Sequence, residues 1–291
     1  MVILHVKRGD KSIFLYETQL NTLVRDIIAN IIVIYNGRLK VERICSEMES
    51  LALHGTMLPP NMIGLTDEQI EELKLVDEWG DRCIPSGGFI FNKDIYGRRN
   101  GKQPLTNMQE LIKKTIADAK ALIASKELIA KNECLTQKQI QQAISLLKGC
   151  CTIIYPMKLP PHDVIRMEFD NIEDLSGTHA SLEVIEPQLA QLWFSGKEMD
   201  PDQKLSTYLG RNDKCKVIVK LQKKSEGAPS REAVISEESR KELMLLAYKK
   251  QEEWKKLEQN DDDDYLNSPW ADNNQMKRSF QGIRGNISWK P

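Results

Sequence analysis

Two short apolar stretches separated by a polar turn open the chain. "VILHV" and "SIFLY" flank a polar segment containing Gly9, which suits a hairpin turn, so two strands are predicted here. Apolar residues then recur with helical spacing over residues 24–34 and again over 38–55. The pair Asn36-Gly37 between them predicts a helix C-cap and hence two separate helices. Together these elements predict a small α+β domain over residues 1–58.

The middle of the chain changes from irregular to helical. Proline and glycine are frequent over residues 59–104, so this part is predicted to be an irregular linker with one short helix. Three Thr/Gln pairs, each three positions apart, have the spacing of a capping box and predict three helix starts. These pairs are Thr66 with Gln69, Thr106 with Gln109, and Thr136 with Gln139. The last two predict a pair of packed helices over residues 105–149.

Strand-like stretches return over residues 150–223, and a charged helix follows. "TIIYPM", "VIRMEF", "QLWFS" and "KVIVKL" each favour a strand. Ser236 can cap an amphipathic helix over residues 236–258, and residues 259–291 form an acidic and aromatic tail. The predicted fold class is therefore α+β. It comprises an N-terminal hairpin-plus-helix domain, a helical middle segment, a second domain rich in strands, and a C-terminal amphipathic helix with an extended tail.

Composition and charge favour a protein partner. The 291 residues include 41 basic and 42 acidic side chains, a formal net charge of -1, so no overall field draws the chain to nucleic acid or to an anionic membrane. The longest apolar run, residues 31–35, is far shorter than the roughly 18 residues that span a bilayer. The N-terminal residues lack a secretory signal pattern, and the six cysteines are scattered. We expect a cytoplasmic protein that binds proteins, with no nucleic acid and no membrane among its partners.

The sequence contains no recognisable catalytic or cofactor motif. "GRRNGK" at residues 97–102 is similar to a phosphate-binding loop, but only three residues separate its glycines, and Gln103 stands where magnesium needs Ser or Thr. The cysteines and histidines lack zinc-ligand spacing, and the run Asp261–Asp264 lacks the glycine and distal glutamate of an EF-hand loop. We therefore expect no catalytic residues, no metal and no cofactor, and hence a protein that is not an enzyme.

Residues 190–221 resemble the second half of ubiquitin. The shared features are an apolar-x-Phe-x-Gly-Lys turn, a Leu-Ser-x-Tyr loop and a final apolar strand. This resemblance implies a ubiquitin-like β-grasp domain over residues 150–223. No diglycine end follows the last strand, so the domain is not a modifier. Trp193 takes the position of an exposed aliphatic residue at which ubiquitin-like domains dock, and it is expected either to anchor a partner or to pack under the helix at 236–258.

The tail combines an acidic run with aromatic residues. Four adjacent carboxylates, Asp261–Asp264, repel one another and need water or cations around them. The residues that follow are of the kind that anchors a peptide in a groove, so the tail is predicted to bind a partner. The complete set of predicted partner-binding residues is Trp193, Tyr265, Leu266, Pro269, Trp270, Phe280 and Trp289. Alternatively, Trp270 or Trp289 folds back onto the β-grasp domain as a strap.

Several long motifs resemble one protein family along the whole chain. They include "LHVKRGD", "YNGRLKVERICSEMESLALHG", "LPPNMIGLTDEQIEELKLVDEWG", "DDYLNSPWADN" and "ISWKP". Together they are similar to the kurly family of cilia- and flagella-associated proteins. The resemblance implies a cytoplasmic protein with ciliary or basal body association that motile cilia need for the assembly or delivery of axonemal dynein arms. It implies no catalytic residues.

Three kinds of function remain open from the sequence. The family resemblance favours a non-enzymatic adaptor that binds axonemal dynein assembly factors or dynein subunits. A ubiquitin-like module could instead link clients to the proteasome or to an AAA unfoldase, which would make the chain a quality-control cofactor. The third possible function is that of a stable structural component of the axoneme.

Overall fold

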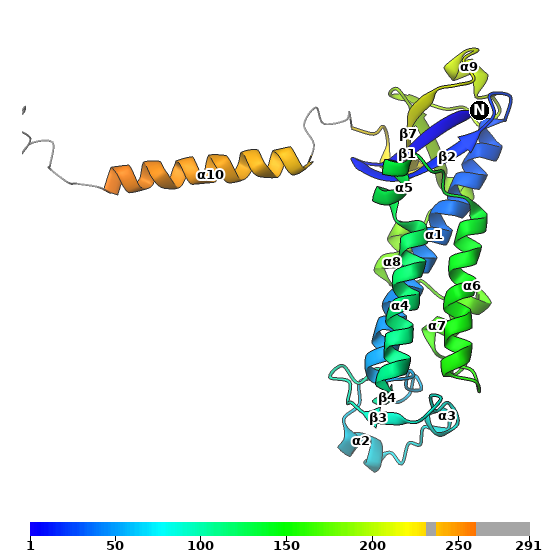
Figure 1. Ribbon diagram of the computed structural model, residues 1–291, viewed down its shortest axis with the longest axis vertical. Coiled ribbons are helices and arrows are strands. Elements are labelled where there is room, and N and C mark those ends of the chain that lie inside the picture. The colour runs from blue at the N-terminus through cyan, green and yellow to red at the C-terminus, as the bar shows by residue number, and fades with distance from the viewer. Residues whose placement is uncertain (231–236, 260–291) are drawn as a thin grey trace, which may run out of the picture. The chain divides into compact units, whose positions relative to one another are not determined.

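The computed structural model describes residues 1–230 and 237–259 (Figure 1). The chain divides into two compact units, Met1–Arg231 and Glu232–Pro291. The first unit contains a mixed five-stranded sheet and several long helices, which confirms the predicted α+β class. Within the described residues, no helix has both the length and the apolarity that crossing a membrane would require.

The five-stranded sheet has the strand order of a β-grasp fold. The order is β2-β1-β7-β5-β6, with β1 parallel to β7 and every other neighbouring pair antiparallel. The strands are β1 (Val2–Arg8), β2 (Lys11–Thr18), β5 (Ala190–Phe194), β6 (Lys197–Glu198) and β7 (Lys216–Lys223). Alternate residues such as Leu4, Phe14 and Leu221 are buried in a core shared with α1 (Val24–His54).

The sequence predicted a β-grasp sheet built from residues 150–223 alone. The structure differs from this prediction, because two of the four expected strands are helical. "TIIYPM" begins within the last turn of α6 (Gln137–Ile154), and "VIRMEF" forms α7 (Val164–Asp170), whose first turn is capped by the Asp163 carboxylate. The N-terminal hairpin takes their place, since β1 pairs directly with β7. The two domains predicted at 1–58 and 150–223 therefore share one sheet.

Helix α1 is continuous over 31 residues, which contradicts the break predicted at Asn36-Gly37. Its length is about 46 Å at 1.5 Å per residue. Gly37 allows close packing, because a Cβ atom there would lie 2.9 Å from Cγ2 of Ile140 on α6. The Asn36 amide donates to the backbone oxygen of Ile185 at 2.8 Å and accepts from its N–H at 3.2 Å. Both residues hold other segments against α1 and do not end the helix.

Two further helices, α4 (Thr106–Ile123) and α6, pack along α1, as Figure 1 shows. The capping box predicted at Thr136 is confirmed. The prediction of a capping box at Thr106 is wrong, because α4 has no side-chain cap and the Gln109 side chain donates to the backbone oxygen of Pro104. The remaining short helices of this unit, outside residues 55–105, are α5 (Ser125–Lys131), α8 (His179–Glu183), η1 (Pro187–Leu189), α9 (Ser206–Leu209) and η2 (Lys224–Glu226).

Residues 56–104, which we call the distal module, lie at the C-terminal end of α1, away from the sheet (Figure 1). The sequence predicted a linker with one helix over most of this segment. The structure has α2 (Asp67–Glu72), α3 (Glu78–Arg82), and a second sheet of β3 (Phe89–Phe91) and β4 (Lys102–Pro104). The capping box of Thr66 and Gln69 is confirmed at the start of α2.

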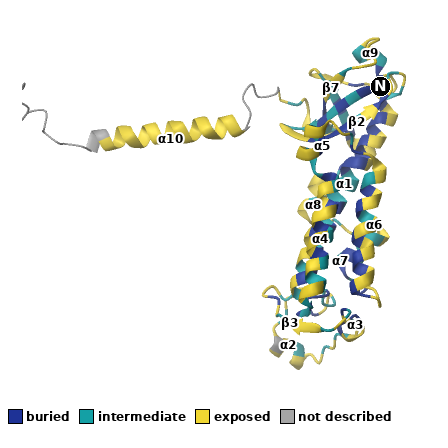
Figure 2. Ribbon diagram, in the orientation of Figure 1, coloured by how far each residue is buried: buried dark blue, intermediate teal, exposed yellow. Residues whose placement is uncertain are grey.

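The second unit contains α10 (Glu237–Gln259), which confirms the helix predicted at 236–258. The predicted cap, Ser236, lies outside the described residues. Its apolar side chains are exposed, as Figure 2 shows. The large ones are Leu243, Met244, Leu245, Leu246, Tyr248 and Trp254. Leu243, Leu246 and Trp254 lie on one side of the helix, as in an amphipathic helix, and Met244 and Leu245 extend the apolar area around it.

Candidate protein-binding surface

The distal module exposes a group of large apolar side chains that we call the distal surface. Its members are Phe89, Ile90, Phe91, Ile95 and Tyr96. The exposed fraction is 94% for Ile95, 80% for Tyr96 and 69% for Phe91. Figure 2 shows β3 as an exposed strand. Several exposed large apolar residues in one short segment indicate a binding site for a protein, membrane or ligand more often than a single exposed residue does.

The loop that carries Ile95 and Tyr96 is fixed by the carboxylate of Asp94. This carboxylate is buried and accepts three backbone hydrogen bonds, from Tyr96 and Arg98 at 3.0 Å and from Arg99 at 3.1 Å. Burial alone would raise the pKa of Asp94, but the three hydrogen bonds and the nearby His54 lower it below its usual value. Asp94 is therefore ionised at neutral pH, and the loop is held in one conformation.

The same loop is joined to α1 by a buried arginine. Arg99 donates from Nη1 to the backbone oxygen of Gly55 at 2.8 Å and from Nη2 to Oε2 of Glu47 at 2.7 Å. Gly55 has φ +76°, and a Cβ atom there would lie 2.4 Å from the backbone oxygen of Lys102. The turn at residues 97–102, the segment that only partly matches a phosphate-binding loop, is thus partly buried and anchors the distal module to α1.

Among residues 1–230 and 237–259, β4 is the one strand that pairs with β3, so the other edge of β3 has no strand neighbour there. Asn92, one residue beyond β3, donates its backbone N–H to the oxygen of Gly101 at 2.8 Å. In an antiparallel pair the hydrogen-bonded positions alternate, so Ile90 faces β4, and the backbone groups of Phe89 and Phe91 face the open edge. The distal surface therefore offers main-chain donors and acceptors as well as apolar side chains.

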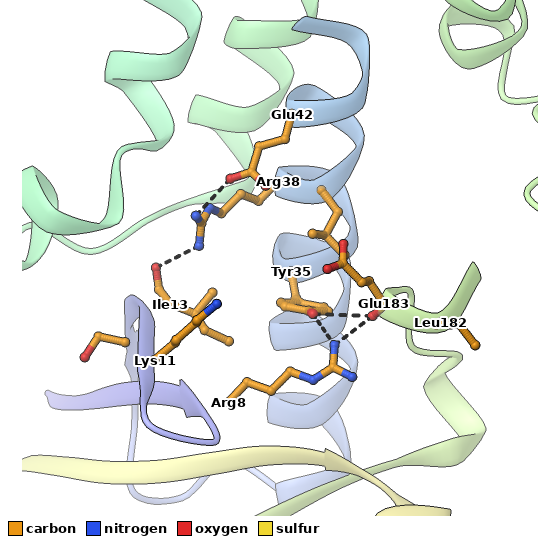
Figure 3. A pocket seen from close by; sticks show the side chains of 10 residues that line it. Arg8, Lys11, Ile13, Tyr35, Arg38, Glu42, Leu182 and Glu183 are labelled. Atoms are coloured by element: carbon orange, nitrogen blue, oxygen red, sulfur yellow. Dashed lines mark hydrogen bonds and ion pairs between the residues drawn. The ribbon is translucent and has the colours of Figure 1, made fainter. Parts of the chain in front are cut away.

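A second feature is a surface pocket of about 480 Å³ beside the β1–β2 hairpin (Figure 3). Arg8, Lys11 and Arg38 line it. Arg8 donates to Tyr35 Oη, to the backbone oxygen of Glu183 at 2.9 Å and to Glu226, while Arg38 donates to Glu42 and to the backbone oxygen of Ile13. The two arginines therefore bind segments of the chain itself, and we assign the pocket a structural role.

Arg8 and Tyr35 of this pocket keep their usual protonation states at neutral pH. Burial opposes the charge on Arg8, but the hydrogen bonds from its guanidinium to Tyr35 and Glu226 raise its pKa above the usual value. Burial also raises the pKa of Tyr35, although the neighbouring Arg8 acts in the opposite direction. The pair stays as a cation and a neutral phenol, and it joins the hairpin, α1 and the segment after β7.

The described residues offer little for metal or thiol chemistry. Among residues 1–230 and 237–259, no three His, Cys, Asp or Glu side chains lie close enough together to hold a metal ion. All six cysteines are free thiols. Burial raises the pKa of Cys45 to about 11 and also raises that of Cys151, so these thiols stay protonated and unreactive at neutral pH.

Comparison with known proteins gives one family. The family model described as "Cilia- and flagella-associated protein 298" matches residues 190–286. Relatives with that name are 56% identical in Mus musculus and 55% identical in Homo sapiens, each over 291 residues and 100% of both chains. "Cilia- and flagella-associated protein 298-A" of Xenopus laevis is 55% identical over the same length. The chain belongs to the cilia- and flagella-associated protein 298 family. No solved structure is significantly similar to it.

Trp193 has intermediate solvent exposure in this cilia- and flagella-associated protein. It is partly buried on β5, opposite Lys220 of β7, and its indole N–H is buried without an acceptor among the described residues. Lys220 is buried too and donates to the backbone oxygen of Ser230 at 2.8 Å, so the chain after β7 lies beside this part of the sheet. A docking role for Trp193 stays a prediction.

The other predicted binding residues, Tyr265, Leu266, Pro269, Trp270, Phe280 and Trp289, lie outside the described residues. The sequence analysis did not select the distal surface. One signal was available, since five large apolar residues fall within eight positions of a segment otherwise rich in Gly, Asn and charged residues. A typical surface loop has fewer apolar residues than that.

Proposed function

We propose that this member of the family is a non-enzymatic adaptor that acts in the cytoplasmic assembly or delivery of axonemal dynein arms. A role in cilia or flagella follows from the family. The observation that supports an adaptor is the distal surface, where exposed apolar side chains stand on a loop fixed by Asp94. A rigid apolar surface binds a partner at a lower entropic cost than a flexible one.

The arrangement of the first unit supports this proposal. Helix α1 extends from the β-grasp sheet to the distal module, so about 46 Å of one helix separates the two. Each end has one proposed contact residue, Trp193 on the sheet and Phe91 on the distal module. An adaptor needs two surfaces at a fixed separation, and a long helix with α4 and α6 packed on it provides such a spacer.

The test is rescue of motile cilia in cells that lack the protein. A variant with Ile95→Ser and Tyr96→Ser removes apolar area but keeps Asp94 and its hydrogen bonds. We expect cilia of normal length with reduced dynein heavy chains and reduced beating. Ile153→Ser is the matched control, because Ile153 is 61% exposed on α6, outside the distal module. Equal rescue by both variants would refute a role of the distal surface.

A second candidate is a cofactor of the proteasome or of an AAA unfoldase. It is favoured by the β-grasp sheet and by Trp193 on β5. In that case Trp193→Ala should reduce co-purification of proteasome or unfoldase subunits, whereas the distal variant should not. A stable structural component of the axoneme would instead remain in salt-washed axonemes in stoichiometric amounts. An assembly factor would be mostly in the cytoplasmic fraction, with a portion near basal bodies.

A further inference from the structure

Lys220 is a buried lysine within the five-stranded sheet. It is paired on both sides, with β1 and with Trp193 of β5, so β7 has no free edge at this position. Its neighbours along the strand, Val219 and Leu221, belong to the hydrophobic core shared with α1. Because side chains alternate between the two faces of a strand, Lys220 lies on the face away from α1. Only 7% of this residue is exposed, so the sheet face is covered at Lys220.

Part of this cover is the chain that follows β7. The Nζ atom of Lys220 donates to the backbone oxygen of Ser230 at 2.8 Å. Since both edges of β7 are paired here, Ser230 reaches Lys220 from the face of the sheet and not as an added strand. Residues 227–230, which we call the crossing segment, therefore turn back after η2 and lie over the face that carries Lys220 and its cross-strand neighbour Trp193.

The crossing segment is fixed at its start and weakly held beyond it. In η2, the Glu226 carboxylate accepts from Nη2 of Arg8 at 3.3 Å. Gly227 follows with φ +73°, in the left-handed region that favours glycine, and the chain reverses there. Within the crossing segment only Pro229 is partly buried, and the other residues are exposed. Little apolar burial therefore opposes release of the segment, and Gly227 is the expected hinge.

The sheet face beside the crossing segment contains polar groups that gain from opening. The indole N–H of Trp193 is buried without an acceptor among the described residues. A buried donor without a partner destabilises the arrangement that buries it. Release of the crossing segment returns this N–H and the Lys220 ammonium to water, or presents them to acceptors of a partner. The closed arrangement is thus opposed by a desolvation cost, as expected of a contact that opens in use.

We infer that the crossing segment is an autoinhibitory contact, which closes the sheet face at Trp193 and is held there by the hydrogen bond from Lys220 to Ser230. Binding of a partner through Trp193 requires the segment to move away first, about Gly227. The inference goes beyond the proposed function, which rests on the distal surface, a separate part of the unit.

Crosslinking within the purified full chain tests the closed arrangement. A photo-reactive phenylalanine derivative replaces Trp193, and in a control protein it replaces Ile153, which is exposed on α6. Mass spectrometry after irradiation should find crosslinks from position 193 to the crossing segment, and none from position 153. If position 193 forms no crosslink to residues 227–230, the inference is wrong.

Two lysine variants test what holds the segment. Lys220→Met removes the hydrogen bond to Ser230 and keeps a long apolar side chain. Lys216→Met is the matched control, because Lys216 lies on the same face of β7 and its Nζ atom donates to Oδ1 of Asn132, also at 2.8 Å. Ser230→Ala is a second control, since Lys220 binds the backbone oxygen of Ser230 and not its hydroxyl group.

Hydrogen exchange at the Trp193 indole N–H measures the opening. Its NMR signal is assigned by its loss in Trp193→Phe. We expect exchange about tenfold faster in Lys220→Met, the effect of one lost hydrogen bond on the open population, and unchanged in both controls. Equal exchange rates in wild type and a folded Lys220→Met would overturn the role of Lys220. If Lys220→Met does not fold, the crosslinking result, obtained with Lys220 intact, decides for or against the closed arrangement.

The same crosslinker at position 193 tests autoinhibition in ciliated cells. Crosslinks to other proteins should be several-fold more abundant with Lys220→Met than with Lys216→Met, because the sheet face is open more of the time. Equal yields, or no crosslink to another protein in either background, would show that the segment does not regulate binding. These variants leave the distal surface unchanged, so the rescue test of Ile95→Ser with Tyr96→Ser is decided separately.

Discussion

At the scale of single residues, the buried side chain of Asp94 links the fold to the distal surface. One carboxylate organises the loop that carries the most exposed apolar side chains of the distal module. Ile95 and Tyr96, which this loop carries, are exposed and therefore contribute little to the hydrophobic core. Order in this loop therefore depends on a polar group, and a change of that group affects the shape of the binding surface before it affects the rest of the unit.

Replacing Asp94 with Asn should lower the free energy of unfolding by about 1–3 kcal/mol. The amide keeps one acceptor oxygen, while its NH₂ group faces at least one backbone N–H and cannot accept from it. Chemical denaturation of the two proteins measures the difference. Asp94→Glu is a useful comparison, because it keeps the charge but moves the carboxylate away from the three donors.

The difference in free energy of unfolding between wild type and Asp94→Asn should become smaller as the pH falls. The folded pKa of Asp94 is lowered, so its contribution is fully present above the unfolded pKa of about 3.9 and is lost as the pH falls through the folded value. The gap between wild type and Asp94→Asn should be constant from about pH 5 to 8 and should narrow below about pH 4. A gap that widens on acidification would show that another group is responsible.

At the scale of elements, two glycines inside helices should respond in opposite ways to the same substitution. Gly37→Ala should destabilise the protein by about 1–2 kcal/mol, because contact with Ile140 outweighs the better helix propensity of alanine. Gly149→Ala on α6 has nothing within 4 Å of the new Cβ atom and should stabilise by about 0.5–1 kcal/mol. Thermal and urea unfolding of both variants test this pair.

A double variant identifies the cause of the Gly37 effect. Shortening Ile140 to Ala makes room for the methyl group, so Gly37→Ala should be less harmful in that background than in wild type. If the two substitutions are simply additive, the contact between α1 and α6 is not the reason for glycine at this position.

Some elements follow from sequence alone, and others do not. The hairpin, α6 and α10 were predictable because turn residues and capping boxes are local signals. "TIIYPM" and "VIRMEF" are short apolar runs, which fit a buried strand or a buried helix turn equally well. Asn36-Gly37 has the form of a C-cap, but its function depends on Ile140 and Ile185, more than 100 residues away.

The candidate site was harder to predict than the fold. Exposure of Phe91 and Ile95 is a property of the packed distal module, and the apolar letters alone indicate burial as readily as exposure. The inward direction of Asp94 likewise requires the turn formed by residues 94–99. Only the family resemblance, from motifs along the whole chain, reached the level of function from the sequence.

At the scale of the whole molecule, an isolated fragment of residues 150–225 should not fold. It contains β5, β6 and β7 but lacks β1, β2 and α1, which supply most of the remaining sheet and its core. Backbone chemical shifts of the fragment should be those of an unfolded chain. Adding residues 1–37 through a short linker should restore dispersed shifts, and a fragment that folds without them would contradict the sheet order.

Removal of the segment after Asn260 tests the predicted role of the tail. Residues Met1–Arg231 form a compact unit of their own, so truncation should leave the thermal midpoint within a few degrees. Rescue of ciliary motility should be lost if the tail binds a partner. A large fall in the midpoint would instead support the alternative in which a tail tryptophan is a strap, and full rescue would show that the tail is dispensable.

The parallel pairing of β1 with β7 also matters during synthesis. The hairpin of β1 and β2 leaves the ribosome before its partner strand, which begins at Lys216, about 200 residues later. At about 5–20 residues per second the hairpin waits about 10–40 s with its apolar edge uncovered. For that interval the nascent chain resembles an aggregation-prone intermediate. Cellular yield of this protein will therefore depend on chaperones at the ribosome as well as on the stability of the finished fold.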